Sequence, residues 1–278
     1  MIRLTQQNLF KEAERYMYAH HRQTLGKLAE KMEQDPSCLA AITSGSVAKG
    51  TASETSDVDV HLVFTDEAYA EYERNSRLSY LDREVSTYEG GYADIKVINR
   101  RFLELAARQG NEPTRYAFTG AEVLFSRIPE LNELVARIPV YPEENREHNL
   151  RDFCAQIYLY GLYFATEAGK KNDAYLLAHT AGQLVFFSGR MILAYNRLLF
   201  PSHKGLLDAA SAAEAQPKNF RTLATELLQS PSADKSMRFA AKMLAFYNHG
   251  LSFEQALGIY VLNNERVWME HPPSLQNR

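Results

Sequence analysis

A short stretch between residues 39 and 64 constrains this chain more than any other part of its sequence. An apolar run at 39–44 leads into Gly45 and Ser46, and a second apolar run opens with Asp57 and Asp59. Apolar runs of this length, bounded by small and polar residues, are typical of buried strands. We therefore predict a strand, a small-residue turn that opens a short helix, and a second strand that begins with two carboxylates.

The two carboxylates indicate a metal site. Asp57 and Asp59 are two residues apart at the start of a strand, so their side chains project from the same face. Asp94 lies in the strand predicted at 92–98 and alternates with apolar neighbours in the same way. Close carboxylates repel each other unless a cation lies between them. Because Mg²⁺ prefers oxygen ligands and uses few protein carboxylates, we predict that these three aspartates bind Mg²⁺.

The turn supplies groups that suit a phosphate. Gly45 and Gly50 allow the backbone to approach a ligand closely, and Ser46 begins a helix whose free N–H groups favour an anion. Lys49 could add a positive charge, and Ser56 a hydroxyl group. A Gly-Ser turn or an Asp-x-Asp pair is common when it occurs alone, whereas their conjunction with a third aspartate favours a nucleotide-binding function.

The composition of the chain limits the classes of protein to which it can belong. The chain has 278 residues, a formal net charge of -3 and 45% hydrophobic residues, as expected for a soluble globular protein. This charge disfavours a nucleic-acid partner. No apolar run approaches the roughly 20 residues that span a bilayer. Cys38 and Cys154 lie beside apolar residues, which favours two reduced, buried thiols in a cytoplasmic protein.

The hydrophobic patterns predict an α+β chain in two domains. Residues 1–140 form a small mixed sheet flanked by helices, and residues 141–278 form an all-α helical bundle. Pro139 and Pro142 mark the change. In the first domain we predict helices at 5–34, 66–79, 100–109 and 129–138, and strands at 39–44, 57–65, 83–88, 92–98 and 121–126, with a Gly90-Gly91 hairpin turn. In the second we predict helices at 147–168, 173–198, 217–229, 233–249 and 253–269, whose aromatic residues form the bundle core.

These motifs resemble the nucleotidyltransferase superfamily that includes DNA polymerase β and the kanamycin nucleotidyltransferases. The matching positions are Gly45, Ser46, Asp57, Asp59 and Asp94. The two-domain arrangement is similar to the stand-alone, antibiotic-modifying branch. The resemblance implies that two Mg²⁺ ions bind an NTP, here ATP, and that AMP is transferred to a hydroxyl group of a small-molecule acceptor with release of pyrophosphate.

The helical domain would then contribute acceptor and nucleotide contacts. We predict that Arg190 and Lys204 contact the nucleotide, although Arg190 could equally form a structural ion pair within its apolar segment. His61, on the same face as the aspartates, is predicted to support Asp59 or to pack in the cleft rather than to bind metal. The candidates for the general base are Asp94, Glu144, Glu147 and Glu167.

Two other functions share these features. A regulatory or antitoxin-like nucleotidyltransferase would transfer AMP to a protein partner. A fused HEPN-like ribonuclease would need an Arg-x4–6-His pattern on a helix, and two stretches fit this pattern loosely: Arg197 to His203 and Arg266 to His271. The aromatic helices could also form a homodimer interface. The sequence does not identify the acceptor, because fold resemblance does not determine the substrate.

Overall fold

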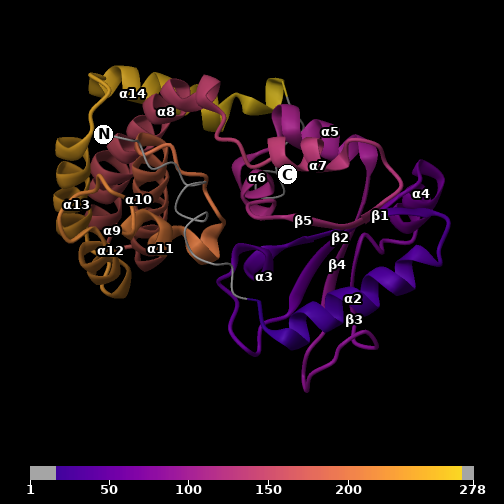
Figure 1. The fold of residues 1–278 in the computed structure, drawn as a ribbon. Helices are drawn as coiled ribbons and strands as arrows, with labels where there is room; N and C mark the ends of the chain where they lie inside the picture. The colour runs from indigo at the N-terminus through magenta and orange to yellow at the C-terminus, as the bar shows by residue number, and fades with distance from the viewer. Residues whose placement is uncertain (1–16, 271–278) are drawn as a thin grey trace, which may run out of the picture. The chain divides into compact units, whose positions relative to one another are not determined.

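The computed structural model describes residues 17–270 of the protein (Figure 1). The chain divides into two compact units, the first ending at Tyr141 and the second beginning at Pro142. The first contains a mixed sheet with helices, and the described residues of the second contain helices without a strand. The predicted α+β class is confirmed.

A five-stranded sheet forms the centre of the first unit. Its strand order is β3-β4-β2-β1-β5. β2 and β4 are parallel, whereas every other neighbouring pair is antiparallel. The strands are β1 (Cys38–Ser44), β2 (Val58–Phe64), β3 (Ser79–Asp82), β4 (Ala93–Asn99) and β5 (Glu122–Ser126).

Helices cover both faces of this sheet, as Figure 1 shows. Leu25 and Leu28 of α2 (Ala19–Glu33) belong to the apolar cluster on one face. Helices α5 (Arg100–Gln109) and α7 (Leu131–Arg137) belong to the cluster on the other. Because successive strand residues point to opposite faces, every central strand contributes to both clusters. The sheet is therefore held firmly in the middle of the unit.

Three shorter helices complete the first unit: α3 (Gly45–Lys49), α4 (Asp66–Arg74) and α6 (Glu112–Ala117). The Thr65 hydroxyl accepts a hydrogen bond from the Ala68 N–H and caps α4. The side chain of Asn111 caps α6 in the same way, through the Thr114 N–H. Helix α6 was not predicted from the sequence because it is one short segment without a periodic apolar face.

One predicted element in the first unit is too long and another is wrong. The helix predicted at 66–79 begins at Asp66 as predicted but ends at Arg74, and Ser76 has a positive φ of 53°. The strand predicted at 83–88 is a loop, because Asp82 Oδ1 accepts hydrogen bonds from the N–H groups of Glu84 and Val85 and turns the backbone. The strand in this region is β3, and it joins β4 through this loop rather than through a tight hairpin.

The helix predicted at 5–34 begins only at Ala19, since Tyr18 is its N-cap. The predicted part before Met17 lies outside the described residues. The predicted end is confirmed, because α2 stops at Glu33 before Asp35-Pro36. The strands at 39–44, 57–65, 92–98 and 121–126 and the helices at 100–109 and 129–138 match β1, β2, β4, β5, α5 and α7 within about two residues at each end.

Helices form the second unit. The α-helices are α8 (Arg146–Tyr158), α9 (Ala165–Lys171), α10 (Ala174–Tyr195), α11 (Leu206–Ser211), α12 (Phe220–Gln229), α13 (Ala233–Phe246) and α14 (Phe253–Tyr260). A π-helical segment, η2 (Leu159–Phe164), joins α8 to α9. Short 3₁₀ helices, η1 (Glu143–Asn145), η3 (His203–Gly205) and η5 (Val267–Met269), and a second π-helical segment, η4 (Val261–Glu265), complete the unit. No described helix is both long and apolar enough to cross a membrane.

Most of the predicted aromatic stripe packs in the core of this unit. Tyr160 is buried, and the rings of Phe153, Phe164, Phe186 and Phe187 pack against the same cluster. Tyr163, in contrast, is half exposed. The core prediction for the aromatic residues therefore holds for most of the stripe.

Glycine 161 shows how tightly these helices pack. A side chain at this position of η2 would place its Cβ 2.1 Å from the Ala240 Cβ of α13. Glycine thus allows η2 and α13 to approach more closely than any other residue would.

Candidate functional site

Strand register brings the three predicted aspartates together. Asp59 of β2 is paired with Asp94 of β4 in the parallel ladder, and Asp57 immediately precedes β2. One carboxylate oxygen from each side chain lies within 4.8 Å of the other two. We call Asp57, Asp59 and Asp94 the acidic cluster. Within the described residues it is the one group of three or more acidic, histidine or cysteine side chains arranged to hold a metal ion.

The acidic cluster is arranged at an electrostatic cost. Burial raises the pKa of Asp59, and the charges of Asp57 and Asp94 raise it further. All three side chains are half-buried, so water screens their repulsion only in part. A hard divalent cation would relieve this repulsion, and carboxylate oxygens are the ligands that Mg²⁺ prefers. The donor set therefore fits the predicted metal.

Gly45 packs directly beside this cluster. Its φ is +68°, and a Cβ on it would lie 1.7 Å from Asp59 Oδ2. Both the backbone conformation and the missing side chain are thus needed for Asp59 to occupy its place. Ser46 follows in α3, and Gly50 ends that helix with a φ of 71° and an N–H donated to Val47 O. The predicted turn and short helix are confirmed, while the phosphate contacts of Gly45 and Ser46 stay predictions.

Lys49 lies over an aromatic ring that the sequence did not indicate. Its Nζ is 5.1 Å from the centroid of the Tyr116 ring in α6. Burial lowers the pKa of Lys49, and the nearby Asp59 partly offsets this effect. Lys49 is therefore close enough to Asp59 to interact with its charge, and its contact with a nucleotide stays a prediction. Tyr116 was missed because α6 itself was not predicted.

Lys96 is a second cation at the cluster and was not among the predicted site residues. Its Nζ lies 2.9 Å from Asp94 Oδ1 and 2.6 Å from the Ser79 hydroxyl of β3. The signal was present in the sequence, since Lys96 is two residues from Asp94 in a strand and therefore shares its face. Lys96 balances part of the negative charge of the cluster.

His61 has a packing role beside the site. It is buried, its Nδ1 lies 3.1 Å from the Ser44 hydroxyl, and its ring lies 4.6 Å from that of Phe118. Burial lowers the pKa of His61 to about 4, with a further contribution from Lys96, so the ring is neutral at pH 7. These contacts agree with the packing alternative predicted for His61.

Ser56 uses its hydroxyl within its own loop. Its Oγ accepts a hydrogen bond from the Ser53 N–H at 2.9 Å and lies 3.0 Å from Ser53 Oγ. The Ser56 carbonyl accepts two further hydrogen bonds, from His21 and Tyr88. The predicted nucleotide contact of this residue stays a prediction, and the observed contacts are structural.

Arg190 and Lys204, the other predicted nucleotide contacts, belong to the second unit. The Arg190 guanidinium lies over the rings of Phe153 and Phe200, at 4.8 and 4.5 Å from their centroids, and 5.9 Å from that of Phe186. Lys204 is exposed in η3. The aromatic contacts give Arg190 a structural partner set, while a nucleotide contact for either residue stays a prediction.

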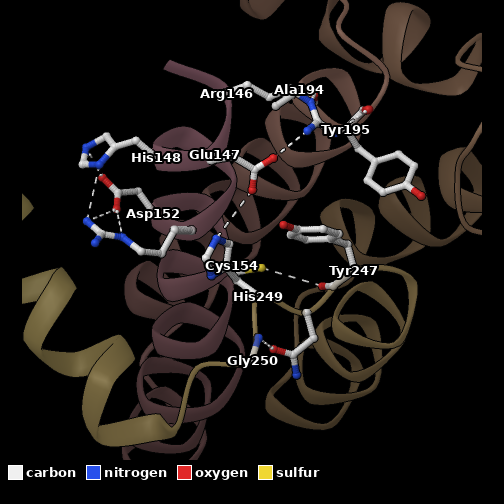
Figure 2. A network of polar contacts seen from close by, with 12 residues as sticks. Arg146, Glu147, His148, Asp152, Cys154, Ala194, Tyr195, Tyr247, His249 and Gly250 are labelled. Atoms are coloured by element: carbon white, nitrogen blue, oxygen red, sulfur yellow. Dashed lines mark hydrogen bonds and ion pairs between the residues drawn. The ribbon is translucent and has the colours of Figure 1, made fainter. Parts of the chain in front are cut away.

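The candidates for the general base differ in their surroundings. Glu147 lies between Arg146 and His249 in Figure 2, with Oε1 2.6 Å from Arg146 Nη1 and Oε2 3.9 Å from His249 Nε2. Glu144 is exposed. Lys170 lowers the pKa of Glu167 through a hydrogen bond of 2.8 Å. Among the candidates, Asp94 alone belongs to the acidic cluster.

The Arg-x4–6-His matches do not form a helical motif in the described residues. Arg197 follows α10 with a positive φ of 57°, and its Nε lies 2.9 Å from Glu143 Oε2. His203 lies in η3 and stacks on the Phe186 ring at 4.8 Å. Arg197 and His203 therefore do not share a helix. For the second match, His271 lies outside the described residues.

One protein-family model matches part of this chain. No curated protein matches the chain. A solved structure, that of a nucleotidyltransferase-like protein from Exiguobacterium sibiricum 255-15, is similar at 11% identity and a TM-score of 0.45, and the match covers 92% of this chain and 82% of that one. The family model named Nucleotidyltransferase domain matches residues 25–105, a range that holds Gly45 and the whole acidic cluster. This match supports a nucleotidyltransferase enzyme whose family domain lies in residues 25–105.

Proposed function

We propose that this protein transfers AMP from ATP to a hydroxyl group of a small-molecule acceptor and releases pyrophosphate. The observation that carries this proposal is the convergence of three carboxylates within 4.8 Å inside the matched domain. In the proposal, Asp57, Asp59 and Asp94 hold two Mg²⁺ ions. When bound, such ions neutralise phosphate charge and support in-line displacement at phosphorus.

The residues of the chain would act around the bound nucleotide. The backbone at Gly45 and the Ser46 hydroxyl would contact the triphosphate, with Lys49 close enough to Asp59 to contribute charge at the same place. Asp94 would accept the proton of the attacking hydroxyl, since it is the base candidate within the cluster. Lys96 would orient the Asp94 carboxylate through the observed ion pair.

The proposal assigns the two domains different tasks. Residues 1–140 would carry the chemistry, and residues 141–278 would bind the acceptor, with the protein in the cytoplasm as a possible homodimer. The antibiotic-modifying branch supplies the acceptor class to be tried first. Transfer of AMP to a protein partner would use the same acidic cluster. The two functions differ only in the molecule that accepts the AMP.

Pyrophosphate release provides the test. The full chain is incubated with Mg²⁺, each of the four NTPs, and a panel of aminoglycosides, lincosamides and candidate proteins. We expect release with ATP and one small-molecule class, accompanied by a mass increase of one adenylyl group on the acceptor. Asp57→Asn and Asp59→Asn should lose turnover, whereas Glu104→Gln, in an exposed pair with Arg100, should keep it. Full turnover in both aspartate variants would refute the metal site.

A further inference from the structure

The loop at 51–57, which joins α3 to β2 and ends at Asp57, is held by side chains from elsewhere in the unit. The carbonyl of Ser56, directly before Asp57, accepts two hydrogen bonds. His21 Nε2 donates one at 2.9 Å, and the Tyr88 hydroxyl donates the other at 2.5 Å. Both lone pairs of this carbonyl are thus occupied by side chains that no step of the proposed reaction uses.

A third hydrogen bond holds the same loop two residues earlier. His20 Nε2 donates to the carbonyl of Glu54 at 2.9 Å. The rings of the three donors form one cluster, with centroids 4.4 Å apart for His20 and Tyr88 and 5.3 Å for His21 and Tyr88. The loop is therefore fixed by a group of packed rings rather than by isolated surface contacts.

The donors are themselves held in place. Thr87, beside Tyr88, donates its hydroxyl to the carbonyl of His20 at 2.9 Å and its N–H to Thr24 Oγ1 at 3.2 Å. Thr24 and His21 are both fully buried in α2. The Tyr88 ring fills the space above Gly91, where a Cβ would lie 2.4 Å from the ring. Helix α2 and the loop before β4 thus form a rigid support.

The support matters because Asp57 is the member of the acidic cluster that lies outside the sheet. Asp59 and Asp94 are fixed by ladder pairing, whereas Asp57 precedes β2. The orientation of the Ser56–Asp57 peptide sets the backbone position from which the Asp57 side chain extends. Two donors on the Ser56 carbonyl hold that peptide plane.

We propose that Tyr88 and His21 are positioning residues that place the Asp57 carboxylate for metal binding through the Ser56 carbonyl. This inference rests on the proposed function, since it takes the acidic cluster as the metal site. Groups that orient metal ligands from the next shell outward commonly change metal affinity about 10–100-fold when removed. Neither side chain would contact the metal, so its loss should weaken binding without removing a ligand.

Mn²⁺ binding to the full chain without nucleotide tests the proposal directly. Mn²⁺ shares the oxygen-ligand preference of Mg²⁺ and its free fraction is measured by electron paramagnetic resonance. Tyr88→Phe removes one hydroxyl and keeps the ring packing, so it should fold. We expect its Mn²⁺ affinity to fall about tenfold. The matched control is Tyr69→Phe in α4, which follows the opposite end of β2, and its affinity should equal that of the wild type.

The His21 contact is tested by a pair of variants. His21→Gln keeps an N–H donor at a similar reach, whereas His21→Leu removes it. We expect the glutamine variant to bind Mn²⁺ within about threefold of the wild type and the leucine variant about tenfold more weakly. If His21→Leu does not fold, Tyr88→Phe still decides the question, because it preserves the buried rings.

Asp57→Asn separates the failure of this inference from that of the proposed function. If Asp57→Asn weakens Mn²⁺ binding but Tyr88→Phe binds like the wild type, the positioning role is refuted and the metal site stands. If Asp57→Asn also binds like the wild type, Asp57 is not a ligand and both proposals fall. A further expected result is that saturating Mn²⁺ restores turnover in Tyr88→Phe but not in Asp57→Asn; failure of this rescue also counts against the positioning role.

Discussion

The acidic cluster in the first unit and Arg190 in the second are both charged groups that are partly buried. Their surroundings differ, because the neighbours of the acidic cluster repel its charge whereas those of Arg190 attract it. Asp59 lies between two charges of the same sign, and these together with burial raise its pKa. Arg190 lies over the faces of Phe153 and Phe200, where the electron-rich rings attract a cation. Carboxylates that repel one another indicate a functional site, whereas the position of a charge with favourable partners is explained by packing alone.

Two glycines extend the comparison. Gly45 and Gly161 each occupy a place where a Cβ would collide with a neighbour. At Gly45 the neighbour is the Asp59 carboxylate, so the close approach shapes the site. At Gly161 it is the Ala240 side chain, so the close approach packs two helices. The same residue type therefore shapes the acidic cluster in one unit and allows dense core packing in the other.

The largest effect should come from Gly45→Ala. The added Cβ would displace Asp59, and a misplacement of about 1 Å can cost about 100-fold in rate. The left-handed backbone should also destabilise the unit by about 1–2 kcal/mol. Pyrophosphate release and thermal unfolding measure the two effects. Gly26→Ala is the matched control, since nothing lies within 4 Å of its Cβ in α2, and it should stabilise the helix by about 0.5–1 kcal/mol. Equal activity in the two variants would remove Gly45 from the site.

Divalent metal should stabilise the first unit through the acidic cluster. At a free Mg²⁺ concentration of 100 times its Kd, the gain is about 2.7 kcal/mol. Asp59→Asn should lose this gain. Without metal, however, the variant should unfold at a higher temperature than the wild type, because it removes a carboxylate that its neighbours repel. Thermal unfolding with and without Mg²⁺ measures both the stabilisation by metal and the stabilising effect of the substitution in its absence. A metal-free variant that is less stable than the wild type would contradict the electrostatic account.

Arg190→Leu tests the attraction between the Arg190 guanidinium and the surrounding aromatic rings. Removing a cation stacked on several rings should destabilise the second unit by about 1–2 kcal/mol, as measured by urea denaturation. Arg221→Leu provides the control, because Arg221 is exposed in its pair with Asp208 and should change stability by less than about 0.5 kcal/mol. Unchanged stability in Arg190→Leu, together with weaker ATP binding, would instead assign Arg190 to the nucleotide.

The smallest effect is a loss of stability at alkaline pH that both units should share. Burial raises the pKa of Cys38 to about 12 and that of Cys154 to about 11, from an ordinary value of 9.0. Each folded thiol keeps its proton while the unfolded thiol loses it, so stability is complete below pH 9 and falls as pH rises toward the folded values. The loss should reach about 1 kcal/mol per thiol at pH 9.5. Cys38→Ala and Cys154→Ala should each remove the contribution of one thiol to this loss of stability. If neither substitution changed the dependence of stability on pH, the buried thiols would not be its cause.

Sequence patterns predicted the parts of the site that depend on local order. Alternation placed Asp94 in a strand, and the same alternation held the unused signal for Lys96. Prediction failed at β3 because that strand is short and lies at the sheet edge, where partly exposed residues show no clear period. It failed at Tyr116 because α6 depends on a cap and on packing rather than on an apolar stripe.

The sequence by itself determined the chemistry of this protein: which residues are carboxylates, which turn needs glycine, and where an αβ unit gives way to helices. Only the tertiary structure decided which groups share a space. The pairing of Asp59 with Asp94, the support of Ser56 by His21 and Tyr88, and the contact of Arg190 with the Phe153 ring all join positions more than 30 residues apart in the chain. Such contacts follow from strand register and core packing, and these properties belong to the whole fold and not to any local stretch.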